Sequence, residues 1–307
     1  MQTIHAALHE VQRGTQVSEG ELSVIPLLKP TAKEANYLTL DEAVKRGGFK
    51  VEEVGESGSV PELRVTNSES LPVFVLDGEQ LLGAKQNRIV NLSLMVPAES
   101  DMVIPVTCVE RGRWSSRSDR FRPSEHVMYA EARASKMAQV TDSMKRGTSV
   151  RHKRANQSAV WSDISAKSAR MESHSSTDAM ESVFRDHKPR LETFVERFVP
   201  VQHQVGAVFV AQGVQCGVEL FDSVSTCATF MPQLVRSWAM DAIDALRLEQ
   251  LARQETADII ERLCRGSWKV SPALGLGWDA RLSEKALTSG TLLVEDHLVH
   301  LAAFARA

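Results

Sequence analysis

Short apolar runs fill the first third of the chain, and their alternating or continuous pattern predicts β-strands. Glycine, proline and small polar residues separate the runs, as expected of turns. In chain order the runs are ELSVIPLL (21–28), FKVEEV (49–54), VPELRVTN (60–67), LPVFVL (71–76), RIVNLSLMV (88–96) and MVIPVTCV (102–109). Several short strands at such close spacing predict a sandwich or barrel-like β-structure in the N-terminal half.

A short helix is predicted among these strands at TLDEAVKRGG. Thr39 is a suitable N-cap, Glu42 lies three positions later, and Gly47 follows the last turn. This arrangement is a capping box closed by a glycine, which satisfies backbone donors at the start of a helix and allows a left-handed residue at its end.

Beyond Trp114 the apolar period lengthens from two to about 3.6 residues, which is typical of amphipathic helices. Helices are predicted within 126–147, within 156–171 after the cap residue Asn156, and from 180 to 198, where Pro189 is expected to kink or split the helix. The intervening SSRSDRFRPS (115–124) looks too polar and too rich in arginine for a core element.

Two β-hairpins are predicted within this helical part. VGAVFVAQGVQCGVELF (205–221) turns at Gln212 and Gly213, and TLLVEDHLVHLAAF (291–304) turns near Glu295 and Asp296. Strands and helices therefore segregate in blocks, and the predicted class is α+β. We expect a β-rich subdomain over 1–115 and an α+β subdomain over 116–307.

Polar side chains gather at the two ends of the runs 88–96 and 102–109. If residues 89–96 pair antiparallel with 103–109, the tripeptide QNR (86–88) lies at the same sheet edge as the segment CVERGRW (108–114). Asparagine and glutamine are disfavoured in strands, so local structure gives little reason for their presence. The candidate site residues are Glu79, Gln86, Asn87, Arg88, Glu110, Arg113 and Trp114.

These residue types suit a phosphorylated, hydroxyl-rich ligand. Arg88 and Arg113 present planar forks for phosphate, and Trp114 presents a flat face for a base. Glu79 and Glu110 are candidates for accepting ribose hydroxyls, for general acid and base, or for holding a metal. Amides such as Gln86 and Asn87 both donate to and accept from hydroxyls. The alternative is that the charged residues form solvated pairs and the tryptophan only covers the core.

Charge is distributed unevenly along the chain. The 307 residues carry a net charge of −3, which gives no whole-molecule attraction to nucleic acid or to an anionic membrane. The segment 111–154, in contrast, holds twelve lysines and arginines against four acidic residues. This basic segment favours a phosphate ligand, although a solvated helix face with a mobile basic loop would have the same composition.

Other patterns restrict the location and the chemistry. The first residues lack the features of a signal peptide, and no apolar run approaches the ~18 to 20 residues that would span a membrane, so a soluble cytoplasmic protein is expected. Four cysteines without CxxC spacing predict neither a disulfide framework nor a metal site, and Cys108 is expected to be a buried thiol.

Several of these segments together resemble a known bacterial family. The segments NSESLPVFVLDGEQLLGAKQNRIVN, VPAESDMVIPVTCVERGRW, VGAVFVAQGVQCGVELFD and LVRSWAMDAID are similar to those of the ADP-ribosylglycohydrolase- and rhodanese-phosphatase-associated proteins. The resemblance spans nearly the whole chain and implies a role in the metabolism of ADP-ribose, NAD or related nucleotides. It places the family's polar motif residues on the candidate site residues given above and implies no catalytic role for any of them.

The sequence therefore predicts a protein that binds an ADP-ribose-, NAD- or other nucleotide-like phosphorylated ligand, with hydrolysis or transfer of that ligand as an additional activity left open. A non-catalytic adaptor, which docks a partner enzyme through the basic segment and the long helices, is the first alternative. Binding of single-stranded nucleic acid is the second, and it has weaker support because aromatic residues do not alternate with the basic ones.

Overall fold

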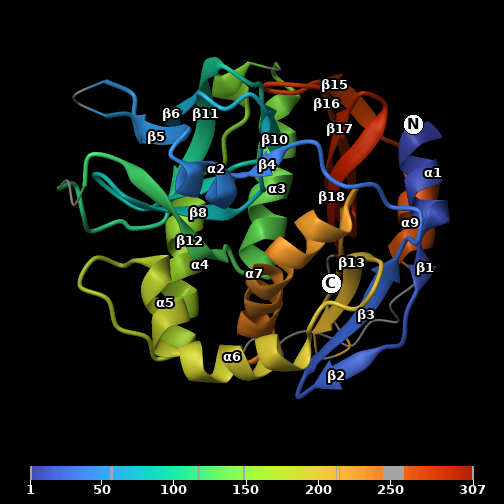
Figure 1. Ribbon diagram of the computed structural model, residues 1–307. Helices are drawn as coiled ribbons and strands as arrows, with labels where there is room; N and C mark the ends of the chain where they lie inside the picture. The colour runs from blue at the N-terminus through green and yellow to red at the C-terminus, as the bar shows by residue number, and fades with distance from the viewer. Residues whose placement is uncertain are drawn as a thin grey trace.

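The computed structural model describes residues 2–55, 58–115, 118–147, 149–211, 213, 215–244 and 259–305 (Figure 1). It confirms a mixed α+β fold whose N-terminal half is rich in strands. In these ranges, the β-structure consists of one large sheet and two smaller sheets.

The large sheet is antiparallel and joins both ends of the chain. Its order is β1 (Gln12–Arg13), β3 (Leu22–Leu28), β13 (Gln204–Ala211), β14 (Gln215–Phe221), β18 (His297–Ala305), β17 (Leu287–Val294), β16 (Trp278–Glu284) and β15 (Lys269–Pro272), with β2 (Val17–Glu19) paired to β3. Strands β13 and β14 are the first predicted hairpin and β17 and β18 the second, so both strand pairings are confirmed, although Gln212 of the first predicted turn lies outside the described residues. Glu295 and Asp296 form the second turn with φ of 48° and 62°.

Helices cover both faces of this large sheet. On β13, Ala207 and Phe209 belong to the apolar core beneath α7 (Val224–Ala242), whereas Val208 belongs to a second core with residues of α1 (Gln2–Glu10) and α9 (Ile259–Arg265). Figure 1 places α1 and α9 on the right of the sheet and α3 (Ala130–Met144) and α7 on the other side. Alternate side chains of one strand are therefore both buried, in different cores.

The N-terminal half forms the two smaller sheets. One has the order β12 (Phe121–Val127), β8 (Glu79–Gly83), β9 (Arg88–Val90), β11 (Ser100–Cys108), β6 (Glu62–Asn67) and β5 (Phe49–Glu53). The other has the order β10 (Leu94–Val96), β7 (Val73–Val75) and β4 (Leu38–Thr39). Both contribute to a third apolar core with α2 (Leu40–Arg46), whose Thr39 cap, Glu42 capping box and left-handed Gly47 are confirmed.

Two predicted elements differ in the structure. The run 88–96 is not one strand: β9 pairs with β11, while β10 pairs with β7 in another sheet. The break falls at Asn91, whose side chain is fully buried, accepts a hydrogen bond from Thr107 at 2.6 Å and donates to the Lys153 carbonyl at 3.0 Å. These two hydrogen bonds satisfy the buried side-chain amide and tie the end of β9 to β11 and to Lys153.

The second difference concerns the arginine-rich segment 115–124, where the prediction that it forms no core element is wrong. Part of it begins β12, which pairs with β8, and Phe121 on this strand is only 3% exposed. Arg122 next to it is exposed. The arginine therefore occupies the solvent side of a half-buried strand, where it is compatible with pairing.

The remaining helices of the described residues are η1 (Val150–His152), α4 (Gln157–Arg170), α5 (Met180–Asp186) and α6 (Lys188–Arg197). Asn156 caps α4 through its side chain, and Pro189 lies in the first turn of α6, which follows α5 after one residue, so the predicted cap and split are both found. The division into 1–115 and 116–307 stays a prediction, although the strand pairs β3–β13 and β8–β12 both cross it. Within the described ranges, no helix combines the length and apolarity needed to cross a membrane.

Candidate functional site

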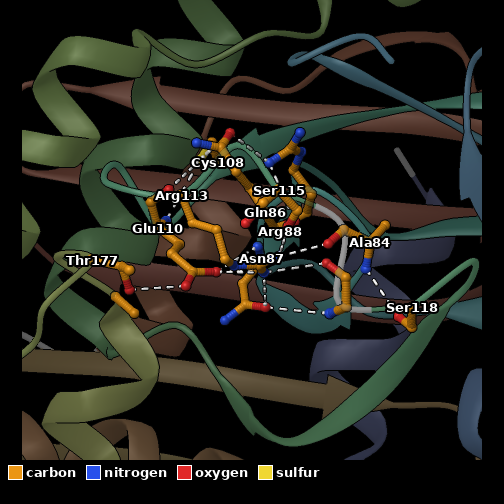
Figure 2. Close-up of polar contacts among 12 residues, drawn as sticks. Ala84, Gln86, Asn87, Arg88, Cys108, Glu110, Arg113, Ser115, Ser118 and Thr177 are labelled. Carbon is orange, nitrogen blue, oxygen red and sulfur yellow. Dashed lines mark hydrogen bonds and ion pairs between the residues drawn. The ribbon is translucent and has the colours of Figure 1, made fainter. Parts of the chain in front are cut away.

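The two polar segments predicted to meet do lie together, at the same end of the paired strands β9 and β11. Strand β9 pairs antiparallel with β11, with Cys108 opposite Arg88 and Thr107 opposite Ile89. The residues just before β9 and just after β11 therefore lie side by side, and Figure 2 shows their polar groups directed toward one another.

Glu110 is the acceptor at the centre of this cluster. Its Oε2 accepts from Nη2 of Arg113 at 2.6 Å and from the backbone N–H of Asn87 at 3.1 Å, and its Oε1 accepts from the Thr177 hydroxyl at 2.9 Å. Burial alone would raise the pKa of Glu110, but the hydrogen bonds from Arg113, Asn87 and Thr177 outweigh it and lower the pKa. The carboxyl group is therefore ionised at neutral pH.

Arg113 organises the loop between β8 and β9. Its Nη1 donates to the Ala84 carbonyl at 2.5 Å and to the Ser115 carbonyl at 2.9 Å, and its Nη2 donates to the Gly83 carbonyl at 3.3 Å. Ala84 has a φ of 40°, a conformation that costs free energy and persists only where neighbouring contacts hold it. The guanidinium therefore fixes the loop, and its assignment as a phosphate ligand stays a prediction.

Arg88 lies under the same loop and has no exposed surface. Its Nη1 donates to the Gln86 carbonyl at 3.3 Å and to Gln86 Oε1 at 3.0 Å, and its Nη2 lies 3.8 Å from Glu53. Burial lowers the pKa of Arg88. Trp114 is 50% exposed, and its ring lies 5.9 Å from the Arg88 guanidinium. The indole is thus the accessible member of this pair.

A cavity of about 290 Å³ opens beside Glu110, and we call it the Glu110 cavity. Besides Asn87 and Glu110, its lining comes from the loop before α5 and from α5 itself: His174, Ser175, Ser176, Thr177, Ala179, Glu181, Ser182 and Arg185. Glu110 is itself covered, whereas Thr177 is half-buried. A ligand in the cavity therefore meets the Thr177 hydroxyl before it meets the carboxylate of Glu110.

Backbone contacts hold this loop against the sheet edge. The N–H of Gly112 donates to the Thr177 carbonyl at 2.9 Å, and the N–H of Met180 donates to the Val109 carbonyl at 2.9 Å. A Cβ at position 112 would lie 2.9 Å from Thr177 Cα, so only glycine permits this approach without a shift.

Glu79 lies in a different environment from Glu110. Its Oε2 accepts from the backbone N–H of Leu76 at 3.0 Å, and burial raises its pKa to about 8. Among the residues that the structure describes, Glu79 is not part of the lining of the Glu110 cavity. The structure therefore does not bring the two predicted catalytic carboxyl groups to one cavity.

Sequence reasoning missed every residue that lines the cavity from the α5 side, and the chemically important ones include Thr177, Glu181 and Arg185. Glu181 lies 3.2 Å from Nδ1 of His126. All three groups come from SHSSTDAMESVFRD, in which the only signal is a dense run of hydroxyl residues just before a helix.

Sequence reasoning also missed a buried ionic network, defined by Asp77, Arg133, Lys136, Glu219 and His300. Lys136 contacts Asp77, Arg133 donates to Glu219 at 2.6 Å, and His300 lies 3.0 Å from Glu219. Burial lowers the pKa of Lys136 to about 8. The basic segment 111–154 is thus not a continuous solvated surface, because some of its cations are core residues; the fully buried ones are Arg133, Lys136 and Lys153.

The fold and the cavity define a mixed α+β protein with an ionised carboxylate held at the end of two paired inner strands of an antiparallel sheet. Residues 10–304 match the family model described as the ARG and Rhodanese-Phosphatase-superfamily-associated Protein domain, and the chain belongs to this family. The family suggested by the sequence motifs is therefore confirmed. Searches of curated proteins and of solved structures find no match.

Proposed function

We propose that the protein binds an ADP-ribose-like or other nucleotide-like phosphorylated ligand in the Glu110 cavity. One observation carries this proposal: an ionised carboxylate at the base of an open cavity is hydrogen-bonded to Thr177 and surrounded by further hydroxyl groups and one arginine. The family association with ADP-ribosylglycohydrolases supports the same ligand class.

Each part of such a ligand has a chemical counterpart in the lining. A ribose hydroxyl replaces the Thr177 hydroxyl as a donor to Glu110, because an ionised carboxylate is a strong acceptor. The hydroxyls of Ser175 and Ser176, together with the exposed Arg185, meet the phosphate. A volume of about 290 Å³ suits a ribose phosphate unit, so a base or second nucleotide extends outside the cavity.

The cavity also offers a group for hydrolysis or transfer of the ligand. Glu181 lines the cavity and lies 3.2 Å from His126. A carboxylate in contact with an imidazole is suited to accept a proton from a water molecule or from a ligand hydroxyl. In this proposal Glu181 takes the role of base, and Glu110 orients the ligand.

Calorimetric titration with ribose, ribose 5-phosphate, ADP-ribose, NAD and inorganic phosphate tests the binding. We expect ribose 5-phosphate and ADP-ribose to bind more tightly than phosphate alone. Glu110→Gln should weaken both about tenfold or more, since it removes the charged acceptor. Arg185→Gln should weaken only the phosphorylated ligands, whereas Arg190→Gln, at an exposed position outside the cavity lining, serves as the matched control.

Chromatography of the reaction mixtures separates binding from turnover. Loss of ADP-ribose or NAD that requires Glu181 would establish a reaction at this cavity. If no compound binds more tightly than phosphate, or if Glu110→Gln binds all of them as the parent chain does, the proposal fails. Docking of a partner enzyme is then the hypothesis to pursue.

A further inference from the structure

A second and larger cavity lies away from the Glu110 cavity. Its volume is about 610 Å³, and its walls come from α1, from residues 29–37 and from the turn between β17 and β18. The described linings of the two cavities share no residue. In Figure 1, α1 lies at the right edge of the molecule and α5, which lines the Glu110 cavity, lies at the lower left. We call the larger one the Tyr37 cavity.

Much of the lining of the Tyr37 cavity is apolar, with Met95, Phe221, Leu276 and Val294 among its residues. The Tyr37 ring is held in place by a tilted contact with Phe74, with 5.8 Å between the ring centroids. A volume of this size with apolar and aromatic lining is typical of sites for small organic molecules. The Tyr37 cavity therefore favours a ligand with an apolar body.

A chain of hydrogen bonds fixes one carboxyl group on the cavity wall. The Tyr37 hydroxyl donates to Oδ1 of Asp222 at 2.5 Å and lies 2.9 Å from the Thr226 hydroxyl. Ser223, the N-cap of α7, donates in turn to the Thr226 hydroxyl at 2.8 Å. Because Tyr37 and Asp222 both line the cavity, this chain holds a polar group in a defined position beside the apolar surface.

Asp222 has an electrostatic environment that a cation would improve. Burial raises the pKa of Asp222, although the hydrogen bond from Tyr37 acts in the opposite direction. Within the described part of the chain, no lysine or arginine forms an ion pair with Asp222, and the basic side chain that lowers the pKa of Asp222 is His297. A ligand cation beside Asp222 would favour the ionised carboxylate.

The charged residues that line the cavity also favour a cationic ligand. Its lining contains two lysines, Lys29 and Lys33, against five acidic residues, Glu10, Glu34, Asp222, Glu295 and Asp296. Lys29 is already paired with Glu10 at 2.7 Å. The surplus is therefore negative, and it attracts cations and repels anions such as phosphates.

We propose that the Tyr37 cavity binds a small organic cation, with its ammonium group beside Asp222 and its apolar part against Tyr37 and Phe221. This site takes a ligand of the opposite charge from the one proposed for the Glu110 cavity. The two sites are therefore tested separately, and failure of one leaves the other standing.

Three indoles of nearly equal size provide the test: tryptamine is a cation, tryptophol is neutral and indole-3-acetate is an anion. Calorimetric titration of the full chain at low ionic strength should show tryptamine binding about tenfold more tightly than tryptophol. Indole-3-acetate should bind more weakly than either. Equal binding of the three compounds, tightest binding of the anion, or no binding of tryptamine at millimolar concentration would overturn the proposal.

Variants locate the binding at the cavity. Asp222→Asn should weaken tryptamine about tenfold and leave tryptophol unchanged. Asp296→Asn changes an exposed turn position whose backbone conformation asparagine also adopts, and it should weaken the binding of tryptamine by a few-fold. This variant replaces Asp222→Asn in the test if Asp222→Asn does not fold. Glu284→Gln changes an exposed carboxylate outside the lining and is the matched control. Unchanged tryptamine affinity in Asp296→Asn and in folded Asp222→Asn would reject the site.

Discussion

Replacement of Glu79 by glutamine should stabilise the protein at neutral and alkaline pH. Glu79 is 1% exposed, and its pKa is raised from the ordinary value of 4.5 to about 8, chiefly by burial. Below pH 4.5 the carboxyl group is protonated in both the folded and the unfolded chain. Between pH 4.5 and 8 only the unfolded chain releases the proton, so the free energy of unfolding falls as the pH rises.

The magnitude follows from the width of this interval. Each pH unit between the two pKa values lowers the free energy of unfolding by about 1.4 kcal/mol. The total loss is about 3 kcal/mol at pH 7 and about 5 kcal/mol above pH 8. Glutamine carries no such cost, and its amide oxygen can still accept from the Leu76 N–H. We therefore expect Glu79→Gln to be near the parent chain in stability at pH 5 and more stable by about 3 kcal/mol at pH 7.

Urea unfolding at pH 5, 6, 7, 8 and 9, followed by tryptophan fluorescence, measures this difference. Lys136 also titrates near pH 8, but its contribution cancels when the variant is subtracted from the parent chain at each pH. Glu196→Gln, at an exposed position, is the matched control, and its difference in free energy of unfolding from the parent chain should not change with pH. A flat difference for Glu79→Gln, or a loss of stability above pH 7, would refute the conclusion that the folded chain holds this carboxyl group protonated.

Three further substitutions test other features by the same unfolding assay. Lys136→Met leaves Asp77 buried without its lysine and should lower the free energy of unfolding by about 3 to 5 kcal/mol. Adding Asp77→Asn to the same chain should restore part of this loss, and a loss below about 1 kcal/mol would contradict a tight buried pair. Gly112→Ala should cost about 1 to 3 kcal/mol because its Cβ meets Thr177 Cα at 2.9 Å, and unchanged stability would mean that the loop shifts freely. Thr39→Ala should cost about 1 kcal/mol through loss of the cap on α2, whereas Thr193→Ala on the exposed side of α6 should cost less.

The sequence predicted best those features that depend on neighbours in the chain. Thr39, Glu42 and Gly47 form a cap within one helix, and Glu295 and Asp296 form a two-residue turn, so local residue types are sufficient for both. The meeting of QNR with CVERGRW was also predictable, because antiparallel pairing of two nearby strands fixes which ends meet.

The rest of the candidate site depends on contacts that the local pattern does not encode. Thr177 and Arg185 reach the cavity from a segment far along the chain, and no period or spacing links them to Glu110. Arg133 belongs to the basic segment 111–154, whose composition alone does not separate surface cations from buried ones, and it lies three residues after the buried Ala130 on the inner face of α3. A charged residue in an apolar stripe was the available signal, and only the distant Glu219 explains it.

The position of β3 in the large sheet has a consequence for synthesis of the chain. Ile25 of β3 pairs with Val208 of β13. Strand β3 is therefore synthesised long before the strand with which it pairs. At about 5 to 20 residues per second, this delay is roughly 10 to 40 seconds. During that time Leu22, Val24 and Leu27, all buried in the finished fold, have no β13 to cover them. The nascent chain is therefore expected to need protection from aggregation until its second half emerges.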